Sequence, residues 1–234
     1  MSNLTPKFIY FDLDDTLLDH KKAEQKGLAD VYQHFDVFTD ISLKTLLNVY
    51  HLINKGLWEE YGRGEIDRFI LQRRRFEETL SRLGIDTALH KQIGNAYMDN
   101  YRNHWEWIDG ARKAFDSIRA KYPVGIITNG FAETQWMKID QFGFRETASQ
   151  IVISEEIGVM KPHPKIFDHS TELVGLERSE ILYVGDSLTS DIKGGKAAGW
   201  KVAWYTKKCT NEEKNLADLV FHDFAELMHS LGIL

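Results

Sequence analysis

The sequence predicts an α/β protein with a parallel sheet, into which an all-α segment is inserted after the first strand. Short apolar runs rich in β-branched and aromatic residues recur along the chain. From residue 124 onward, each run is separated from the next by sequence that can form a helix or a loop, and this alternation indicates parallel strands with helices on both faces. Residues 17 to about 105, by contrast, contain no convincing strand.

Six runs are predicted to form the strands of the sheet: Phe8–Leu13, Val124–Thr128, Ile151–Ile153, Ile181–Val184, Lys201–Tyr205 and Leu219–Phe221. Helical sequence follows several of them. The stretch over residues 132–143 has helical spacing and ends at a glycine, and the stretch over residues 164–175 begins with proline and ends with glycine, as helices often do. A further helix can begin at a serine or threonine within residues 187–199.

The inserted segment is predicted to form a domain of its own. It has the pattern of four amphipathic helices, at about residues 22–35, 42–60, 65–83 and 86–105. A right-handed crossover between parallel strands needs only one helix, so the other helices are an insertion. We therefore expect residues 1–16 and 106–234 to form the core and residues 17–105 to form a helical cap. An insertion at this point would lie above the carboxyl ends of the strands, where open α/β sheets bind ligands.

The composition limits the classes of partner. The 234 residues include 29 Lys and Arg against 35 Asp and Glu, and this net charge of −6 disfavours a nucleic acid polymer as a partner. No apolar run approaches the ~20 residues of a membrane span, and the N-terminus lacks the basic start and apolar stretch of a secretory signal. The single cysteine, Cys209, cannot form an internal disulfide and fits a reducing compartment. We expect a cytoplasmic protein without a membrane partner, either a monomer or a homodimer.

Polar residues follow four of the predicted strands. The segments are Asp12-Leu13-Asp14-Asp15-Thr16, Thr128-Asn129-Gly130, Lys161-Pro162 and Gly185-Asp186-Ser187, with Asp191 a little further along. Because the carboxyl ends of parallel strands meet at one edge of a sheet, we expect these segments to lie close together.

Three of the carboxylates in these segments are expected to converge, where they would repel one another. Asp12 and Asp14 are two residues apart, so an extended chain points both to the same side, and Asp186 arrives from another strand. Converging carboxylates need a hard cation with oxygen ligands, and Mg²⁺ fits because it also binds substrate phosphates. The sequence therefore predicts a magnesium site formed by Asp12, Asp14 and Asp186.

The remaining polar residues are suited to a phosphate group. Lys161 supplies a positive charge and Thr128 a hydroxyl group. Asn129 and Gly130 supply backbone N–H groups at the expected start of a helix, where anions commonly bind. We expect these four residues to bind the phosphate of a substrate.

The four motifs, "DLDDT", "TNG", the Lys161-Pro162 pair and "GDSLTSD", resemble those of the haloacid dehalogenase superfamily in order and spacing. The resemblance covers essentially the whole chain and implies a Rossmann-like core with a helical C1-type cap. Within the superfamily, the stretches "LWEEYGRGEI", "GIITNGF" and "VISEEIGVMKP" are similar to the pyrimidine 5′-nucleotidase branch. The implied activity is Mg²⁺-dependent hydrolysis of a small phosphomonoester through an aspartyl-phosphate, with a pyrimidine nucleoside 5′-monophosphate as substrate.

The resemblance also implies a role for each matching residue. Asp12 would be the nucleophile, and Asp14 would be the general acid and then the general base. Asp12 and Asp186 would bind Mg²⁺ through their carboxylates, and Asp14 would do so through its backbone carbonyl.

Other matching residues would support this chemistry. Thr128 and Lys161 would hold phosphate oxygens and offset developing charge, with Lys161 acting in catalysis. Asp191 would orient Asp186 or a metal-bound water, while Thr16 would steady the first loop by hydrogen bonding. Asp15 is not needed by this chemistry and is expected to cap a turn or to point to water.

Two aromatic residues have an open interpretation. Trp58, in the inserted segment, lies in polar sequence, so it could stack on a substrate base or pack as a core residue. Phe131 directly follows the "TNG" motif, so it could line the substrate pocket or pack at a helix start.

Several alternative functions are compatible with parts of the pattern. They are a phosphatase for another small metabolite such as a sugar phosphate, a dehalogenase, a phospho-acceptor signalling protein, a sugar-phosphate mutase and a phosphonate hydrolase that would use Lys55. Dehalogenation has no use for an acid two residues after the nucleophile, so Asp14 argues against it. Receiver domains of signalling proteins have nearly half this length and no all-α insertion.

Overall fold

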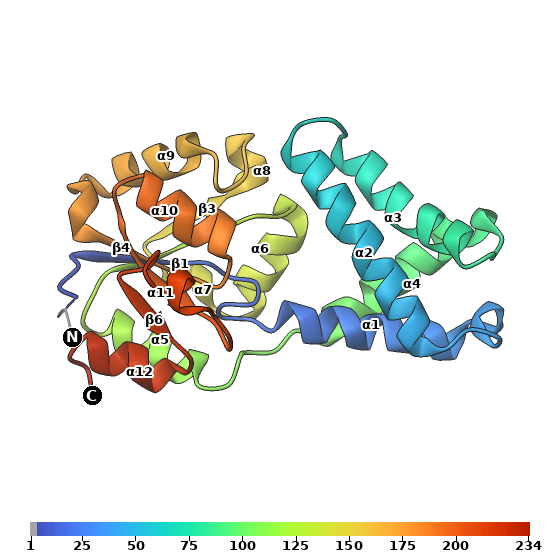
Figure 1. The fold of residues 1–234 in the computed structure, drawn as a ribbon, viewed down its shortest axis with the longest axis horizontal. Coiled ribbons are helices and arrows are strands. Elements are labelled where there is room, and N and C mark those ends of the chain that lie inside the picture. Colours follow the sequence, from blue (N-terminus) through green and yellow to red (C-terminus); the bar gives the residue numbers. More distant parts are fainter. Residues whose placement is uncertain (1–3) are drawn as a thin grey trace. The chain divides into compact units, whose positions relative to one another are not determined.

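The structure, a computed structural model, describes residues 4–234. It forms two compact units: the chain up to Asp19 together with Trp107–Leu234, and His20–Glu106 between them in sequence. The first unit contains the sheet and the second is helical (Figure 1). The function of the helical unit as a cap stays a prediction.

The first unit contains a parallel sheet of six strands in the order β3-β2-β1-β4-β5-β6. The strands are β1 (Phe8–Phe11), β2 (Val124–Thr128), β3 (Gln150–Ile153), β4 (Ile181–Gly185), β5 (Lys201–Tyr205) and β6 (Leu219–Phe221). Ile9 of β1 lies opposite Val124 of β2 on one side and Leu182 of β4 on the other. The predicted fold class is confirmed. The strand order reverses between β1 and β4, and such switch points are where open α/β sheets bind ligands.

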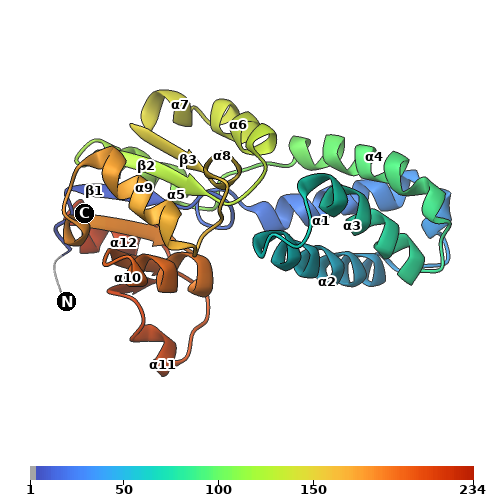
Figure 2. The ribbon, with the colours of Figure 1, turned by 90° about the horizontal axis from the view of Figure 1, so that it is seen from above.

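Strand β1 is apolar throughout because both faces of the sheet are covered. Its alternate residues enter two different cores: Ile9 and Phe11 pack in one, and Phe8 and Tyr10 pack in the other. The first core is covered by α5 (Ala111–Arg119), α6 (Ala132–Gln141) and α12 (Phe224–Ser230), and the second by α9 (Pro164–Val174). Figure 2 shows these helices on both faces of the sheet.

Several short segments complete the first unit. They are α7 (Phe144–Thr147), α8 (Ser154–Ile157), η3 (Arg178–Glu180), the π-helical segment η4 (Leu188–Lys193), α10 (Gly194–Ala197) and α11 (Asn211–Lys214). The helix expected within residues 187–199 is thus divided into η4 and α10. Ser187 caps the N-terminus of η4, because its side chain accepts a hydrogen bond from the Ser190 N–H.

The helical unit consists of α1 (His20–His34), η1 (Asp36–Phe38), α2 (Leu43–Gly62), α3 (Arg68–Arg82), η2 (Thr87–Leu89) and α4 (His90–Asn103). Helix α1 packs on α4, and α2 packs on α3. At Gly27 of α1, an added Cβ would lie 3.0 Å from the Cα of Tyr101, so the glycine permits the close approach of α1 and α4. Ser42 and Asp67 cap the N-termini of α2 and α3.

No helix within residues 4–234 is both long and apolar enough to cross a membrane. Cys209 is a half-buried free thiol.

Candidate active site

The chain turns sharply just after β1. The strand ends at Phe11, two residues before its predicted end, although the Asp12 N–H still donates to the Val184 carbonyl of β4 at 2.8 Å. Asp15 has a φ of +62°, and its N–H donates to the Leu18 carbonyl at 2.7 Å. Asp15 therefore forms part of a turn, as expected. Because the segment is not extended, residues two apart need not point to the same side.

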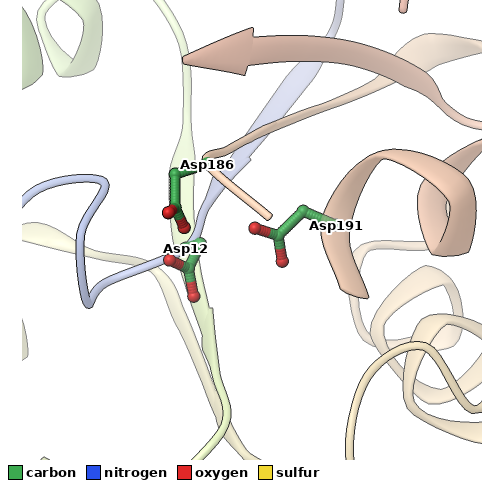
Figure 3. Close-up of side chains that lie close together, drawn as sticks. All are labelled: Asp12, Asp186 and Asp191. Carbon is green, nitrogen blue, oxygen red and sulfur yellow. The ribbon is translucent and has the colours of Figure 1, made fainter. Parts of the chain in front are cut away.

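The carboxylates of Asp12, Asp186 and Asp191 come together at the switch point between β1 and β4. One oxygen of each lies within 4.8 Å of the others, and the three side chains lie close together (Figure 3). Asp12 and Asp191 are buried, while Asp186 is partly exposed. The expectation that the Asp14 carboxylate joins Asp12 and Asp186 is wrong, because the turn directs Asp14 to another partner. Asp191 supplies the third carboxylate.

Asp191 reaches this cluster because Gly185 has no side chain. A Cβ added at Gly185 would lie 2.5 Å from the Asp191 Cγ, which is far too close for two carbon atoms. The Ser187 N–H donates to Asp191 Oδ2 at 2.9 Å and fixes the carboxylate in this position. Two features of the sequence "GDSLTSD" thus place Asp191: the absence of a side chain at Gly185 and the hydrogen bond from the Ser187 N–H.

Lys161 joins two of the three carboxylates. Its Nζ lies 2.7 Å from Asp12 Oδ1 and 2.8 Å from Asp191 Oδ1, and it also contacts the Ile127 carbonyl at 3.1 Å and the Tyr183 hydroxyl at 2.5 Å. The lysine is 3% exposed. Burial lowers the pKa of Lys161, but the two carboxylates outweigh it and raise that pKa above its usual value. The side chain is therefore a fixed ammonium group.

The cluster holds more negative charge than Lys161 neutralises. The pKa of the Asp12 carboxyl is raised to about 7, mainly by burial. Lys161 acts to lower this pKa, and the negative charge of Asp191 acts to raise it. When all three carboxylates are ionised, one ammonium group leaves two negative charges in excess. Carboxylate oxygens are the ligands that Mg²⁺ prefers, so the residues present fit a divalent cation of this kind.

The "TNG" segment is tied to Lys161 and to helix α8. The Asn129 side chain donates to the Lys161 carbonyl at 3.0 Å and accepts from the Lys161 N–H at 2.8 Å, which fixes the segment that carries the lysine. The Gly130 N–H donates to Ser154 Oγ at 3.1 Å, so this N–H already has a partner within the protein. Of the two backbone N–H groups expected to bind phosphate, only that of Asn129 stays a prediction.

The start of α6 is likewise occupied by a protein group. Its Ala132 N–H donates to Glu155 Oε2 at 2.7 Å. A carboxylate at this position also compensates the positive end of the helix.

The carboxylate of Asp14 lies against α6. Lys138 Nζ lies 2.6 Å from Asp14 Oδ1 and 2.8 Å from Oδ2, and Gln135 donates to Oδ2 at 3.0 Å. Gln135 also donates to the Thr128 hydroxyl at 2.6 Å. On the other side of the turn, the Thr16 hydroxyl donates to Asp12 Oδ2 at 2.9 Å, so Thr16 steadies the proposed nucleophile directly.

Comparison with known proteins shows which family the chain belongs to. The model of the haloacid dehalogenase-like hydrolase family matches residues 9–205. The chain belongs to this family. The haloacid dehalogenase resemblance seen in its motifs is thereby confirmed.

The relatives of this haloacid dehalogenase-like hydrolase include phosphatases. It is 34% identical over 212 residues to pyrimidine 5′-nucleotidase YjjG of Escherichia coli K12, and the match covers 90% of each chain. It is 30% identical over 235 residues to glyceraldehyde 3-phosphate phosphatase of Pyrococcus furiosus, covering 96% of this chain and 92% of that one. The crystal structure of the hydrolase YfnB of Bacillus subtilis, bound to magnesium, matches with a TM-score of 0.84 at 28% identity, covering 97% and 99% of the two chains.

Three side chains near the haloacid dehalogenase motifs were not predicted from the sequence. Tyr183 lies inside the apolar run of β4, where a tyrosine is normally a core residue. Gln135 and Lys138 lie on α6, and their spacing of three residues places them on one face of that helix. The signal available in the sequence was this polar pair on a helix that directly follows the "TNG" motif.

The two aromatic candidates lie in different units. Phe131 is buried at the N-terminus of α6 in the sheet unit. Trp58 is half-buried on α2 of the helical unit, and its ring meets the ring of Tyr61 edge-on with centroids 5.6 Å apart. Their contributions to substrate binding stay predictions.

Proposed function

We propose that this hydrolase is a Mg²⁺-dependent phosphatase of small phosphomonoesters, with a pyrimidine nucleoside 5′-monophosphate as its substrate. The observation that carries the proposal is the cluster of Asp12, Asp186 and Asp191, in which the buried ammonium group of Lys161 pairs with Asp12 and Asp191. It combines a carboxylate nucleophile, a set of oxygen ligands and a fixed positive charge at the switch point of the sheet.

In the first step, a carboxylate oxygen of Asp12 attacks phosphorus while the bond to the ester oxygen breaks. The leaving alkoxide takes a proton from Asp14, which is ionised when it pairs with Lys138 and has to take up a proton before this step. Thr16 and Lys161 each hold one oxygen of Asp12, so its carboxylate is oriented before the substrate binds. Lys161 and Thr128 offset the charge that develops on the phosphoryl oxygens.

In the second step, water hydrolyses the aspartyl-phosphate. Asp14, now ionised, takes a proton from the water as its oxygen bonds to phosphorus. The bond between phosphorus and the Asp12 oxygen breaks, which releases phosphate and restores both carboxyl groups to their starting states. Asp14 thus needs a position within hydrogen-bond reach of both the leaving oxygen and the attacking water.

The carboxylates of Asp12 and Asp186 would hold Mg²⁺, with Asp191 beside them and the Asp14 carbonyl as a further ligand. When bound, the ion neutralises negative charge on the carboxylates and the substrate phosphate. The site therefore requires ionised carboxylates, and Lys161 assists by favouring the charged form of Asp12.

The substrate class is supported by the relatives. YjjG is a pyrimidine 5′-nucleotidase, and 34% identity over 90% of both chains supports a nucleotide substrate for this protein. The archaeal relative acts on glyceraldehyde 3-phosphate, so a small sugar phosphate is the second candidate. We further propose that the helical unit acts as the cap and that Trp58 contributes to the choice of leaving group.

A phosphate-release screen over nucleoside monophosphates and sugar phosphates, with Mg²⁺ present, tests the proposal. We expect many turnovers per enzyme, with the highest kcat/KM on a pyrimidine nucleotide, and none with the Asp12→Asn variant. A higher kcat/KM on sugar phosphates would move the substrate to the second candidate. Halide release from a 2-haloacid, or a single slow turnover, would contradict the phosphatase itself.

A further inference from the structure

Gln135 and Lys138 form a buried fork on α6 that holds one carboxylate. Both residues are 2% exposed, and each contacts Asp14 across 121 to 124 positions in the sequence. Burying an ammonium group is costly unless it is paired and hydrogen-bonded, so the paired carboxylate is a requirement for Lys138 to lie here. The two contacts of Lys138 and the one of Gln135 engage both oxygens of Asp14.

Gln135 also connects Asp14 to the segment that we assign to phosphate binding. One N–H of its amide donates to Asp14 and the other donates to the Thr128 hydroxyl at 2.6 Å. The amide lies in space left by Gly130, where an added Cβ would lie 2.9 Å from the Gln135 Cδ. The "TNG" glycine thus makes room for the side chain that joins Asp14 to Thr128.

We propose that Lys138 and Gln135 are positioning residues for the proton-transfer group Asp14, an inference that rests on the proposed function. Asp14 forms a β-bridge with Leu18 at the start of the turn, and its side chain is 22% exposed, so its fixed partners are the side chains of the fork. Proton transfer needs a heavy-atom distance of about 2.6–3.2 Å, and a misplacement of about 1 Å costs on the order of 10²-fold in rate. The fork supplies this fixed placement and ties it to Thr128.

A purely structural ion pair predicts a different outcome from a positioning fork. If Lys138 only stabilises the fold, its removal lowers the melting temperature and leaves the kcat of the folded enzyme unchanged. If Lys138 acts through Asp14, its effect on kcat disappears once Asp14 has lost that ability. A double-mutant cycle distinguishes these two roles.

The experiment measures kcat and KM of Lys138→Met, Lys138→Arg and Gln135→Met in the wild-type and Asp14→Asn backgrounds, with an alkyl phosphate as substrate. We expect Lys138→Met to lower kcat by about 10–10²-fold with KM changed less than about threefold, because transition-state positioning is lost and ground-state binding is kept. Lys138→Arg should restore most of this loss. In the Asp14→Asn background, the further loss should be less than about twofold.

Lys196→Met is the matched control, since Lys196 forms an exposed ion pair with Asp218 at 3.1 Å in the same unit. It should leave kcat unchanged. Should Lys138→Met fail to fold, Gln135→Met carries the test, with an expected loss of about 3–10-fold that is smaller in the Asp14→Asn background, where only the contact with Thr128 remains to be lost. Equal losses in both backgrounds, or wild-type kcat in Lys138→Met, would overturn this inference and leave the proposed function standing. Wild-type kcat in Asp14→Asn would instead overturn the proposed function on which it rests.

Discussion

The Tyr183 hydroxyl lies 2.5 Å from the Nζ of Lys161, and it also donates to the Ile127 carbonyl at 3.0 Å. Tyr183 is fully buried in β4, so this contact reaches the cluster from inside the sheet. The hydroxyl accepts a hydrogen bond from Lys161 and so helps to fix the lysine beside the carboxylates. A residue of the core thereby supports a residue of the site.

We expect Tyr183→Phe to lower both stability and activity. Loss of a buried hydrogen bond to a charged group costs about 1.5–3 kcal/mol in the free energy of unfolding, and a less fixed Lys161 should lower kcat by roughly 3–10-fold. Tyr10→Phe is the matched control, because Tyr10 lies opposite Tyr183 on the neighbouring strand and its hydroxyl donates to the Ser170 carbonyl at 2.9 Å. It should lose stability and keep wild-type kcat. Identical kcat values for the two variants would limit Tyr183 to a packing role.

Gly185→Ala should weaken Mg²⁺ binding without a change in any ligand. The new Cβ would collide with Asp191, whose Cγ lies 2.5 Å from the Cβ position, so that carboxylate must leave the cluster. Groups that orient metal ligands typically contribute 10–100-fold to affinity, and we expect a loss of about that size in a Mg²⁺ titration of activity. Gly56→Ala serves as the control, since a Cβ there meets nothing within 4 Å. An unchanged Mg²⁺ titration in Gly185→Ala would show that Asp191 contributes nothing to the metal site.

Asp186→Asn should have opposite effects on the stability of the protein with and without Mg²⁺. In chelator, removing one of three like charges relieves repulsion, so the melting temperature should equal or exceed that of the wild type. At a Mg²⁺ concentration of 100 times the wild-type Kd, the free energy of unfolding of the wild type should rise by about 2.7 kcal/mol. That of the variant should rise much less. Melting curves of both proteins in both buffers give the comparison. An equal gain from Mg²⁺ in the two proteins would remove Asp186 from the metal site.

The strands could be predicted from the sequence because a sheet covered on both faces requires continuous apolar runs. Val124–Thr128, Lys201–Tyr205 and Leu219–Phe221 have the bounds that were predicted. The first strand was predicted to extend to Leu13, because its apolar pattern continues beyond Phe11 into a turn whose geometry depends on the positive φ of Asp15. β3 and β4 each extend one residue beyond the predicted bounds, to Gln150 and Gly185. The local pattern therefore locates the strands to within one or two residues, whereas it does not predict the turn.

The site was less predictable where it depends on contacts distant in sequence. Asp14 was expected beside Asp12 on the assumption of an extended chain, but Lys138, 124 residues away, pairs with it. The N–H of Gly130 was expected to face a phosphate, but Ser154 from the next strand-helix junction accepts its hydrogen bond. Motif spacing indicates which residues reach the sheet edge, and it does not specify how their side chains pair there.

The central claim is that Asp12 forms a covalent phosphate that Asp14 helps to hydrolyse. The most direct test is intact-protein mass spectrometry after incubation with an activated aryl phosphate and Mg²⁺. An activated leaving group needs little protonation, so Asp14→Asn should complete the first step and lack the base for the second, whose loss costs about 10²–10⁴ in rate. We predict that Asp14→Asn gains the mass of one phosphoryl group, mapped to Asp12, and that Asp12→Asn gains none. Wild-type turnover by Asp12→Asn, or a phosphoryl group mapped to Asp15, would contradict the account.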